Sequence, residues 1–216
     1  MPLARIATLK DAFISNAFST IPSSLHPLKV LIAHATPSLM CSSAQFAQHE
    51  CVQVSIYTFE NRSAAPYLFD ASSGTFDVVV LRGVLDNALD VSRVIFEVQR
   101  VLKPCGKLIF DATSRNLATW LHLVTFERIL RLEPWSHRNW RLFVDPEEMM
   151  RVLTAYNFSS FKTVSFSSFV SLSRLLAGNP ILDSISVEST DGDGHEYCVQ
   201  ALNRGCDSAY RFPASV

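Results

Sequence analysis

The chain has 216 residues, enough for one domain with a substantial core, or for one domain with an extension. Its net charge of −1 excludes the strongly basic surface that non-specific nucleic-acid binding requires. With 48% hydrophobic and 18% charged residues the composition is that of a globular protein, and no apolar stretch reaches the ~20 residues of a membrane span. Five scattered cysteines without a C-x-x-C pair predict reduced thiols in an intracellular compartment and no metal site.

Residues 1–28 are predicted to form a helical extension to a main domain at 29–216. Within the extension, Ile6, Leu9 and Phe13 recur at helical spacing. The same segment is rich in serine and has a single acidic residue, as mitochondrial presequences do. We therefore expect a helix that packs on the domain and could also serve as an uncleaved mitochondrial signal, which predicts a mitochondrial protein.

The first half of the main domain has two predicted strands, 29–33 and 52–57, with a weak helix over 38–48 between them. The segment from Glu60 to Phe76 is too short for a helix, a strand and a loop, because a parallel crossover alone needs ~10–12 residues. We therefore expect the outer edge of the sheet, with the third strand and its helix, to be shortened or lost.

The second half begins with a continuous apolar run at 76–81, typical of a strand buried on both faces of a parallel sheet. Asp90 is predicted to cap the next helix. Gly106 is the expected turn residue after that helix, followed by a strand at 107–112. The apolar stripe of the helix consists of Val91, Val94, Ile95, Val98 and Leu102.

The last third contains one more helix and two strands. Asp145 is predicted as its N-cap, with Pro146 in the first turn and Glu148 completing a capping box. Strands at 161–166 and 196–202 would form an antiparallel pair that closes the sheet. The alternation of strands and helices predicts an α/β protein with a Rossmann-like, mostly parallel sheet.

Four motifs then point to one family. Residues 76–110, FDVVVLRGVLDNALDVSRVIFEVQRVLKPCGKLIF, are similar to the common part of class I methyltransferases. More specific are 113–116, TSRN, the insert at 120–149, WLHLVTFERILRLEPWSHRNWRLFVDPEEM, and 179–182, NPIL. Together they resemble the ubiquinone-biosynthesis O-methyltransferases, the polyprenyl-dihydroxybenzoate methyltransferase family. The resemblance implies the class I methyltransferase fold, with S-adenosylmethionine as cofactor.

The turn after the first strand departs from that family. The family has a glycine-rich turn there, because the backbone adopts positive φ and lies directly against the cofactor. Here the turn has His34, Ala35 and Thr36, and no glycine precedes Gly74. The sequence therefore predicts a degenerate cofactor site.

Two further family positions are altered. The acid that binds the ribose at the end of the second strand is replaced near Tyr57, and Glu60 comes too late to take its place. The family's Glu-His pair after the next strand is replaced by Asp86 and Asn87. His137 fits the family's turn histidine, although a lone histidine is more often structural.

These departures leave three functions open. The first is a catalytically inactive methyltransferase-like protein without a cofactor, kept as a structural or assembly subunit of a larger, mitochondrial complex. The alternative is an active O-methyltransferase of quinone biosynthesis that uses S-adenosylmethionine, with Asp86 and His137 as its catalytic residues. A third is a module that binds a lipid or a quinone.

An apolar insert at 117–143 is the predicted interaction surface. Its apolar residues surround the helix, which must therefore be covered on both sides. We expect protein subunits to cover it, with membrane or lipid contact, or folding back as a lid, as alternatives. The expected interface residues are Trp120, Leu123, Val124, Phe126, Leu130, Trp135 and Trp140.

Overall fold

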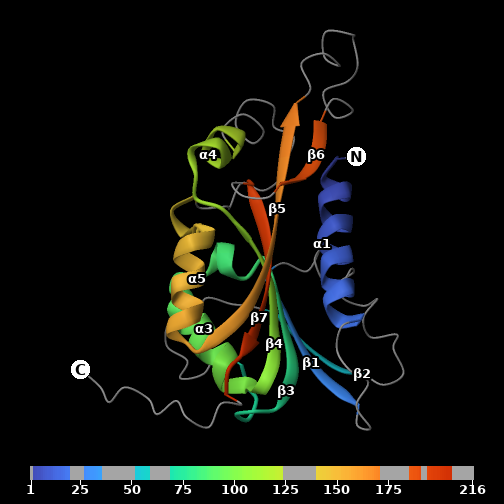
Figure 1. Cartoon of the computed structure of the whole chain (residues 1–216), viewed down its shortest axis with the longest axis vertical. Coiled ribbons are helices and arrows are strands. Elements are labelled where there is room, and N and C mark those ends of the chain that lie inside the picture. The colour runs from blue at the N-terminus through green and yellow to red at the C-terminus, as the bar shows by residue number, and fades with distance from the viewer. Residues whose placement is uncertain are drawn as a thin grey trace, which may run out of the picture.

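The computed structural model describes residues 2–19, 27–35, 52–58, 69–123, 140–170, 185–190 and 194–205. These residues form one seven-stranded sheet with helices on both faces (Figure 1). The strand order is β2–β1–β3–β4–β7–β5–β6. The predicted α/β, Rossmann-like architecture is therefore confirmed.

Four parallel strands form one half of the sheet: β1 (Leu28–His34), β2 (Val52–Thr58), β3 (Phe76–Arg82) and β4 (Leu102–Thr113). The other half is antiparallel and consists of β7 (Glu196–Asn203), β5 (Phe158–Val170) and β6 (Ile185–Thr190). The predicted parallel strands and the predicted terminal pair, β5 and β7, are both confirmed.

The two edges of the described sheet are β2 and β6. Residues 59–68, where the sequence predicts the shortened or lost third strand, lie outside the described residues. At the other edge β6 pairs with the second half of β5, from Ser165 to Val170, a strand that we did not predict.

Helices cover both faces of the sheet. On one face lies α1 (Pro2–Ser19), and on the other lie α3 (Val91–Val101) and α5 (Pro146–Ala155), with α4 (Leu117–Leu123) beyond the end of β4 (Figure 1). The predicted helix at 38–48 lies outside the described residues. Within the described part of the chain, no helix has the length and apolarity to cross a membrane.

The core has two layers, one on each side of the sheet. Beneath α3 and α5, alternate residues of the central strands, such as Leu31, Val79 and Leu81, pack against both helices. Beneath α1, the opposite faces of the same strands pack against Ile14 and Ala17. Because β1, β3 and β4 are buried on both faces, they appear in the sequence as continuous apolar runs.

The junction between α3 and β4 differs in part from the prediction. Asp90 caps α3 as expected, accepting a hydrogen bond from the Arg93 N–H at 3.0 Å. However, the residue with positive φ is Cys105, at 61°, and not Gly106. Gly106 is required for space, since a Cβ there would lie 2.7 Å from the Leu102 Cγ. Cys105 is disulfide-bonded, which corrects the expectation that all cysteines are reduced.

The start of α5 is also partly corrected. Pro146 begins the helix as predicted, but the Asp145 side chain makes no capping hydrogen bond. Its carboxylate instead accepts a hydrogen bond from the Ser114 hydroxyl at 3.1 Å. Glu148 forms an ion pair with Arg115 at 3.0 Å. These acids therefore connect α5 to the loop after β4.

Candidate functional site at the carboxyl ends of the strands

The strand order places a topological switch point between β1 and β3. The chain leaves β1 for β2 on one side and then returns to β3 on the other side. In open α/β sheets, ligands bind at the carboxyl ends of the strands at such a point. The last residues of the two strands, His34 and Arg82, are paired in register there.

The middle of α1 lies over the end of β3. The Arg82 Nη1 donates to the Asp11 Oδ1 at 2.6 Å, and the Arg82 side chain is only 2% exposed. One turn later, Ile14 packs on the strand positions that precede the ends. Asp11 contacts the carboxyl end of β3, whereas Ile14, which follows it in α1, packs on earlier residues of the strands. The helix α1 therefore runs antiparallel to the four parallel strands.

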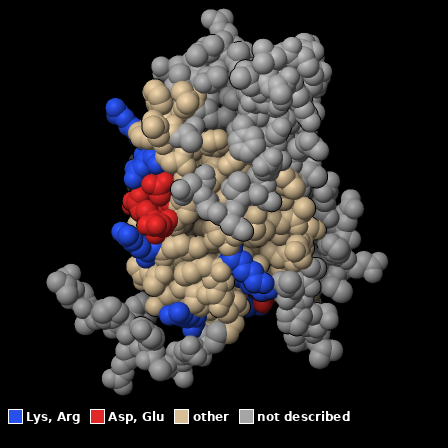
Figure 2. Space-filling view, turned by 45° about the horizontal axis from the view of Figure 1, so that its top comes forward, with Lys and Arg blue, Asp and Glu red and all other residues tan. Residues whose placement is uncertain are grey.

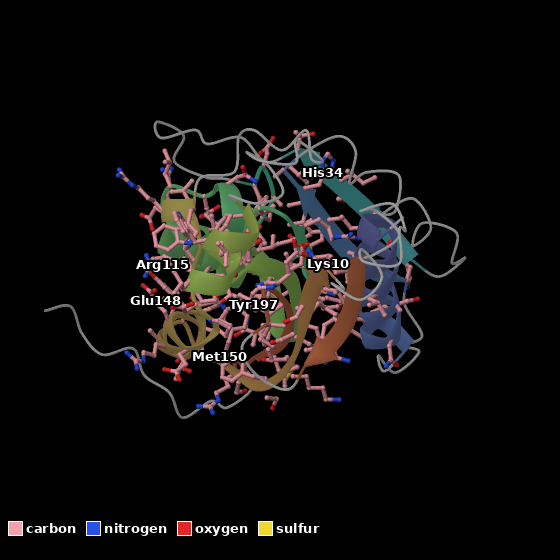
Figure 3. The ribbon with its side chains drawn as sticks, turned by 90° about the horizontal axis from the view of Figure 1, so that it is seen from above. Lys10, His34, Arg115, Glu148, Met150 and Tyr197 are labelled. Carbon is pink, nitrogen blue, oxygen red and sulfur yellow. The ribbon has the colours of Figure 1, made fainter. Side chains whose placement is uncertain are left out.

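Lys10 links α1 to two further strands. Its Nζ lies 3.0 Å from the Asp111 Oδ2 on β4 and 2.7 Å from the Glu196 Oε2 on β7. Burial alone lowers the pKa of Lys10, but the two carboxylates outweigh it and raise that pKa above its ordinary value. Figure 3 shows Lys10 beside α1, on the opposite side of the sheet from Arg115.

Asp111 is the centre of this charge network. It accepts the Gly83 N–H at 2.8 Å in addition to the Lys10 ammonium. Burial alone raises its pKa, but Lys10 and Arg82 outweigh that effect and hold the pKa of Asp111 below its usual range. Burial also raises the pKa of the neighbouring Cys198 thiol, which is therefore unreactive at neutral pH. Both ions of the Lys10–Asp111 pair are thus charged in the folded protein.

His34 differs from Lys10, Arg82 and Asp111 in that neither polar atom of its side chain has a partner. It is 1% exposed, and neither ring nitrogen has a hydrogen-bond partner. Figure 3 shows it at the strand ends, apart from Lys10. A buried polar group without a partner costs roughly 1–3 kcal/mol, so this position needs a specific explanation.

The other predicted cofactor positions have structural roles or are not described. The Ala35 N–H donates to the Arg82 carbonyl at 3.1 Å. The Tyr57 hydroxyl donates to the Asp70 carbonyl at 2.9 Å, which connects β2 to the segment before β3. Thr36 and Glu60 lie outside the described residues. The described cofactor positions are therefore held by the protein's own backbone, apart from His34.

Asp86 acts as a brace. Both of its carboxylate oxygens accept hydrogen bonds from Thr113, one from the backbone N–H at 2.8 Å and one from the hydroxyl at 2.6 Å. This ties the loop after β3 to the end of β4. Among the described residues, no cluster of three or more His, Cys, Asp or Glu side chains could hold a metal ion. His137 lies outside the described residues, so its catalytic assignment stays a prediction.

A second buried donor without a partner is the indole N–H of Trp140, which lies on the opposite side of β3. The sequence predicts only an interface role for this residue. The short helix η5 (Trp140–Leu142) packs against η3 (Leu85–Asn87), which follows β3. Nearby, the Tyr197 hydroxyl is committed to the Val144 carbonyl at 2.8 Å. Burial raises the pKa of Tyr197, which keeps it from acting as a base at neutral pH.

The described part of the apolar insert is exposed. Leu117, Trp120 and Leu121 of α4 are 78%, 45% and 58% exposed. Of the other predicted interface residues, Trp140 is half-buried. The remaining ones are Leu123, whose side chain is not described, and Val124, Phe126, Leu130 and Trp135, which lie outside the described residues. The interface therefore stays a prediction.

Charged side chains on the described surface alternate in sign. Figure 2 shows acidic side chains gathered between basic ones on the side where α5 lies. Arg115 pairs with Glu148 at 3.0 Å, and Arg151 lies 3.9 Å from Glu147. On this face, the described Lys and Arg residues do not gather into a continuous basic patch.

The described residues fit a polar cofactor at the switch point. His34 offers an uncommitted hydrogen-bonding group at the end of β1, on the face of the sheet that α1 covers. A glycine cradle is absent from the described end of the turn, at His34 and Ala35. Any such contact must therefore come from side chains or from backbone that lacks glycine.

Comparison with known sequences identifies the relatives. A sequence profile described as "Methyltransferase domain" matches residues 38–110. The ubiquinone biosynthesis O-methyltransferase of Vibrio campbellii is 31% identical over 83 residues, which cover 38% of this chain and 35% of that enzyme. The enzyme of the same name from Pasteurella multocida is 27% identical over 131 residues, covering 60% and 51%. The match to the first relatives thus spans about a third of their length.

Solved structures show the same fold. A SAM-dependent methyltransferase from Archaeoglobus fulgidus aligns with a TM-score of 0.55 at 10% identity, covering 91% of this chain and 94% of that one. One from Thermotoga maritima aligns with a TM-score of 0.54 at 17% identity, covering 92% and 90%. The chain is therefore a protein of the class I methyltransferase fold, related in sequence to the ubiquinone biosynthesis O-methyltransferases.

Proposed function

We propose that this protein is an S-adenosylmethionine-dependent O-methyltransferase that acts on a quinone precursor. The observation that carries the proposal is the extent of the sequence match, from residue 38 to residue 110. This range includes β2, β3 and the first part of β4 up to Phe110, and the carboxyl end of β3 borders the switch point. The relatives found by sequence share one name, ubiquinone biosynthesis O-methyltransferase.

The cofactor would bind on the α1 side of β3 and the methyl acceptor on the other side. When bound, the cofactor supplies a methyl group on a sulfonium centre. On the α1 side, His34 would hold it and the Lys10–Asp111 network would keep water from the strand ends. On the other side, the Trp140 N–H is available to an oxygen of the methyl acceptor. Since Asp86 is committed to Thr113, His137 is the better candidate for the base.

A second candidate is an inactive subunit of a larger, mitochondrial complex that binds no cofactor. The observation that favours it is that Tyr57 and Asp86 are both held by hydrogen bonds within the fold. The exposed apolar side chains of α4 would then contact partner subunits. A lipid- or quinone-binding module would use the same surface.

One experiment separates these candidates. The purified protein is titrated calorimetrically with S-adenosylmethionine and then supplied with a polyprenyl-dihydroxybenzoate and methyl-labelled cofactor. The proposal expects saturable binding at micromolar concentrations and label in the acceptor. Absence of binding at about 1 mM cofactor, a Kd that corresponds to only about −4 kcal/mol, would contradict it and favour the subunit role.

A further inference from the structure

We propose that His34 is the residue with which this chain binds a polar group of S-adenosylmethionine, in place of the contacts that a glycine-rich turn makes. The inference rests on the proposed function and adds a residue that the family pattern does not provide. It starts from one observation: a fully buried imidazole whose two nitrogens have no partner.

The surroundings of His34 make this observation informative. On the same face of the sheet, the charged groups Lys10, Arg82 and Asp111 all have short, direct partners, although the Nε of Arg82 makes no hydrogen bond. Earlier in β1, the positions on that face are the apolar residues Val30 and Ile32. An apolar residue at position 34 would continue that pattern and remove an unsatisfied polar group. The imidazole is therefore unfavourable for the fold of the unliganded protein.

The position of His34 points to a ligand. It ends β1 in register with Arg82 of β3, so it lies directly at the switch point where open α/β sheets bind ligands. A neutral imidazole carries one donor and one acceptor. It can therefore form a hydrogen bond with a hydroxyl, ammonium or carboxylate group of a ligand, and no charged residue is needed for that bond. S-Adenosylmethionine carries all three groups.

The test uses the full chain and three variants. His34→Leu removes both hydrogen-bonding nitrogens, His34→Gln keeps a donor and an acceptor, and Ile32→Val is a matched control on the same face of β1. Calorimetry measures the Kd for S-adenosylmethionine and for S-adenosylhomocysteine, and thermal unfolding gives the Tm without ligand. In the unchanged protein, the ¹⁵N resonances of the His34 imidazole are recorded with and without S-adenosylhomocysteine.

We expect His34→Leu to raise the Tm of the unliganded protein and to weaken cofactor binding at least tenfold. His34→Gln should weaken binding less. Ile32→Val should lower the Tm slightly and leave the Kd unchanged. The His34 ¹⁵N resonances should shift on saturation with ligand, as they must if a ring nitrogen gains a partner.

The outcomes separate this inference from the proposed function. If the unchanged protein binds no cofactor, both fall. If it binds and His34→Leu binds equally well, the function stands and the role of His34 is overturned. Should His34→Leu fail to fold, unshifted ¹⁵N resonances in the liganded, unchanged protein overturn the inference by themselves.

Discussion

Arg82, the last residue of β3, and Asp11, in the middle of α1, form an ion pair with 2.6 Å between Nη1 and Oδ1. The guanidinium is buried, whereas the Asp11 side chain is 24% exposed. The helix is therefore attached to the sheet by charge at the strand ends and by apolar packing further along. A segment whose composition resembles a presequence is thus a structural part of the domain.

Replacing Asp11 with Ala should destabilise the protein by about 2 kcal/mol, because it leaves a buried guanidinium without its partner. This loss of stability is smaller than the ~3–5 kcal/mol expected when one partner of a fully buried ion pair is removed, because Asp11 is partly exposed. Urea unfolding measures the change. Asp11→Asn keeps an acceptor and should cost less, and equal stability of Asp11→Ala and the unchanged protein would show that the pair contributes nothing.

Lys10→Met should lower the free energy of unfolding by about 3 kcal/mol at pH 7, since two buried carboxylates lose their cation. The pKa of Asp111 is lower in the folded protein than its ordinary value near 4. The stability that Asp111 contributes is therefore fully present above about pH 4 and is lost as the pH falls through the folded-state pKa. The pKa of Lys10 is higher in the folded protein than its ordinary value near 10.4. The stability that Lys10 contributes is therefore fully present below about pH 10 and is lost as the pH rises through the folded-state pKa.

The stability difference between the unchanged protein and Lys10→Met should therefore be constant from about pH 5 to 9 and shrink below about pH 4. Urea unfolding at a series of pH values provides the measurement. Lys10→Arg, which retains the charge, serves as the control. A difference that grows toward acid pH would contradict the assignment.

Thr113→Val should destabilise the protein by about 1–3 kcal/mol, because it removes the hydroxyl that donates to the buried Asp86 carboxylate at 2.6 Å. The side chain keeps nearly the same shape, so the loss reports the hydrogen bond. Chemical unfolding of Thr113→Ser, which retains the hydroxyl, should show a smaller change. An unchanged stability of Thr113→Val would mean that the hydroxyl contributes nothing.

Gly194→Ala should destabilise the protein by about 1–3 kcal/mol, because a Cβ there would lie 2.7 Å from the Phe166 N and 2.8 Å from the Phe166 O, both on β5. Gly74→Ala is the contrasting variant. Its Cβ would have no atom within 4 Å, and only its φ of +64° opposes the change, at about 1 kcal/mol. Thermal unfolding of both tests the order, and a larger loss at Gly74 would refute it.

Trp120→Ser should change the free energy of unfolding by no more than about 0.5 kcal/mol, because the indole is exposed. If the insert is an interaction surface, the same change should reduce the partner proteins that co-purify from cells. Thr154→Ala, at an exposed position on α5, is the control. Undiminished co-purification with Trp120→Ser would argue against this surface.

The central strands could be predicted from sequence because each is marked by a short, continuous run of apolar residues. The run at 76–81 is apolar at nearly every position, and only a strand buried on both faces needs that. The cap at Asp90 is equally local. β6 was missed because it is stabilised by pairing with a distant serine-rich part of β5, and its own sequence carries no apolar run.

The candidate site was less predictable because its contacts cross long stretches of chain. Helical spacing shows that α1 has an apolar face, but it does not show that Lys10 and Asp11 meet β4, β7 and β3. Family pattern identified His34 as a missing glycine. Only the fold shows that its ring is buried without a partner.

The ion pairs of α1 also set the order in which this protein can be completed. Lys10 and Asp111 are separated by 101 positions, and Glu196 lies further along the chain still. Contacts of such long range form late, after the intervening loops have closed. During synthesis, Lys10 of α1 has neither of its acidic partners until β4 and β7 have been made. Until then the charged turn and the apolar face of α1 are both open to chaperones and to other binding proteins.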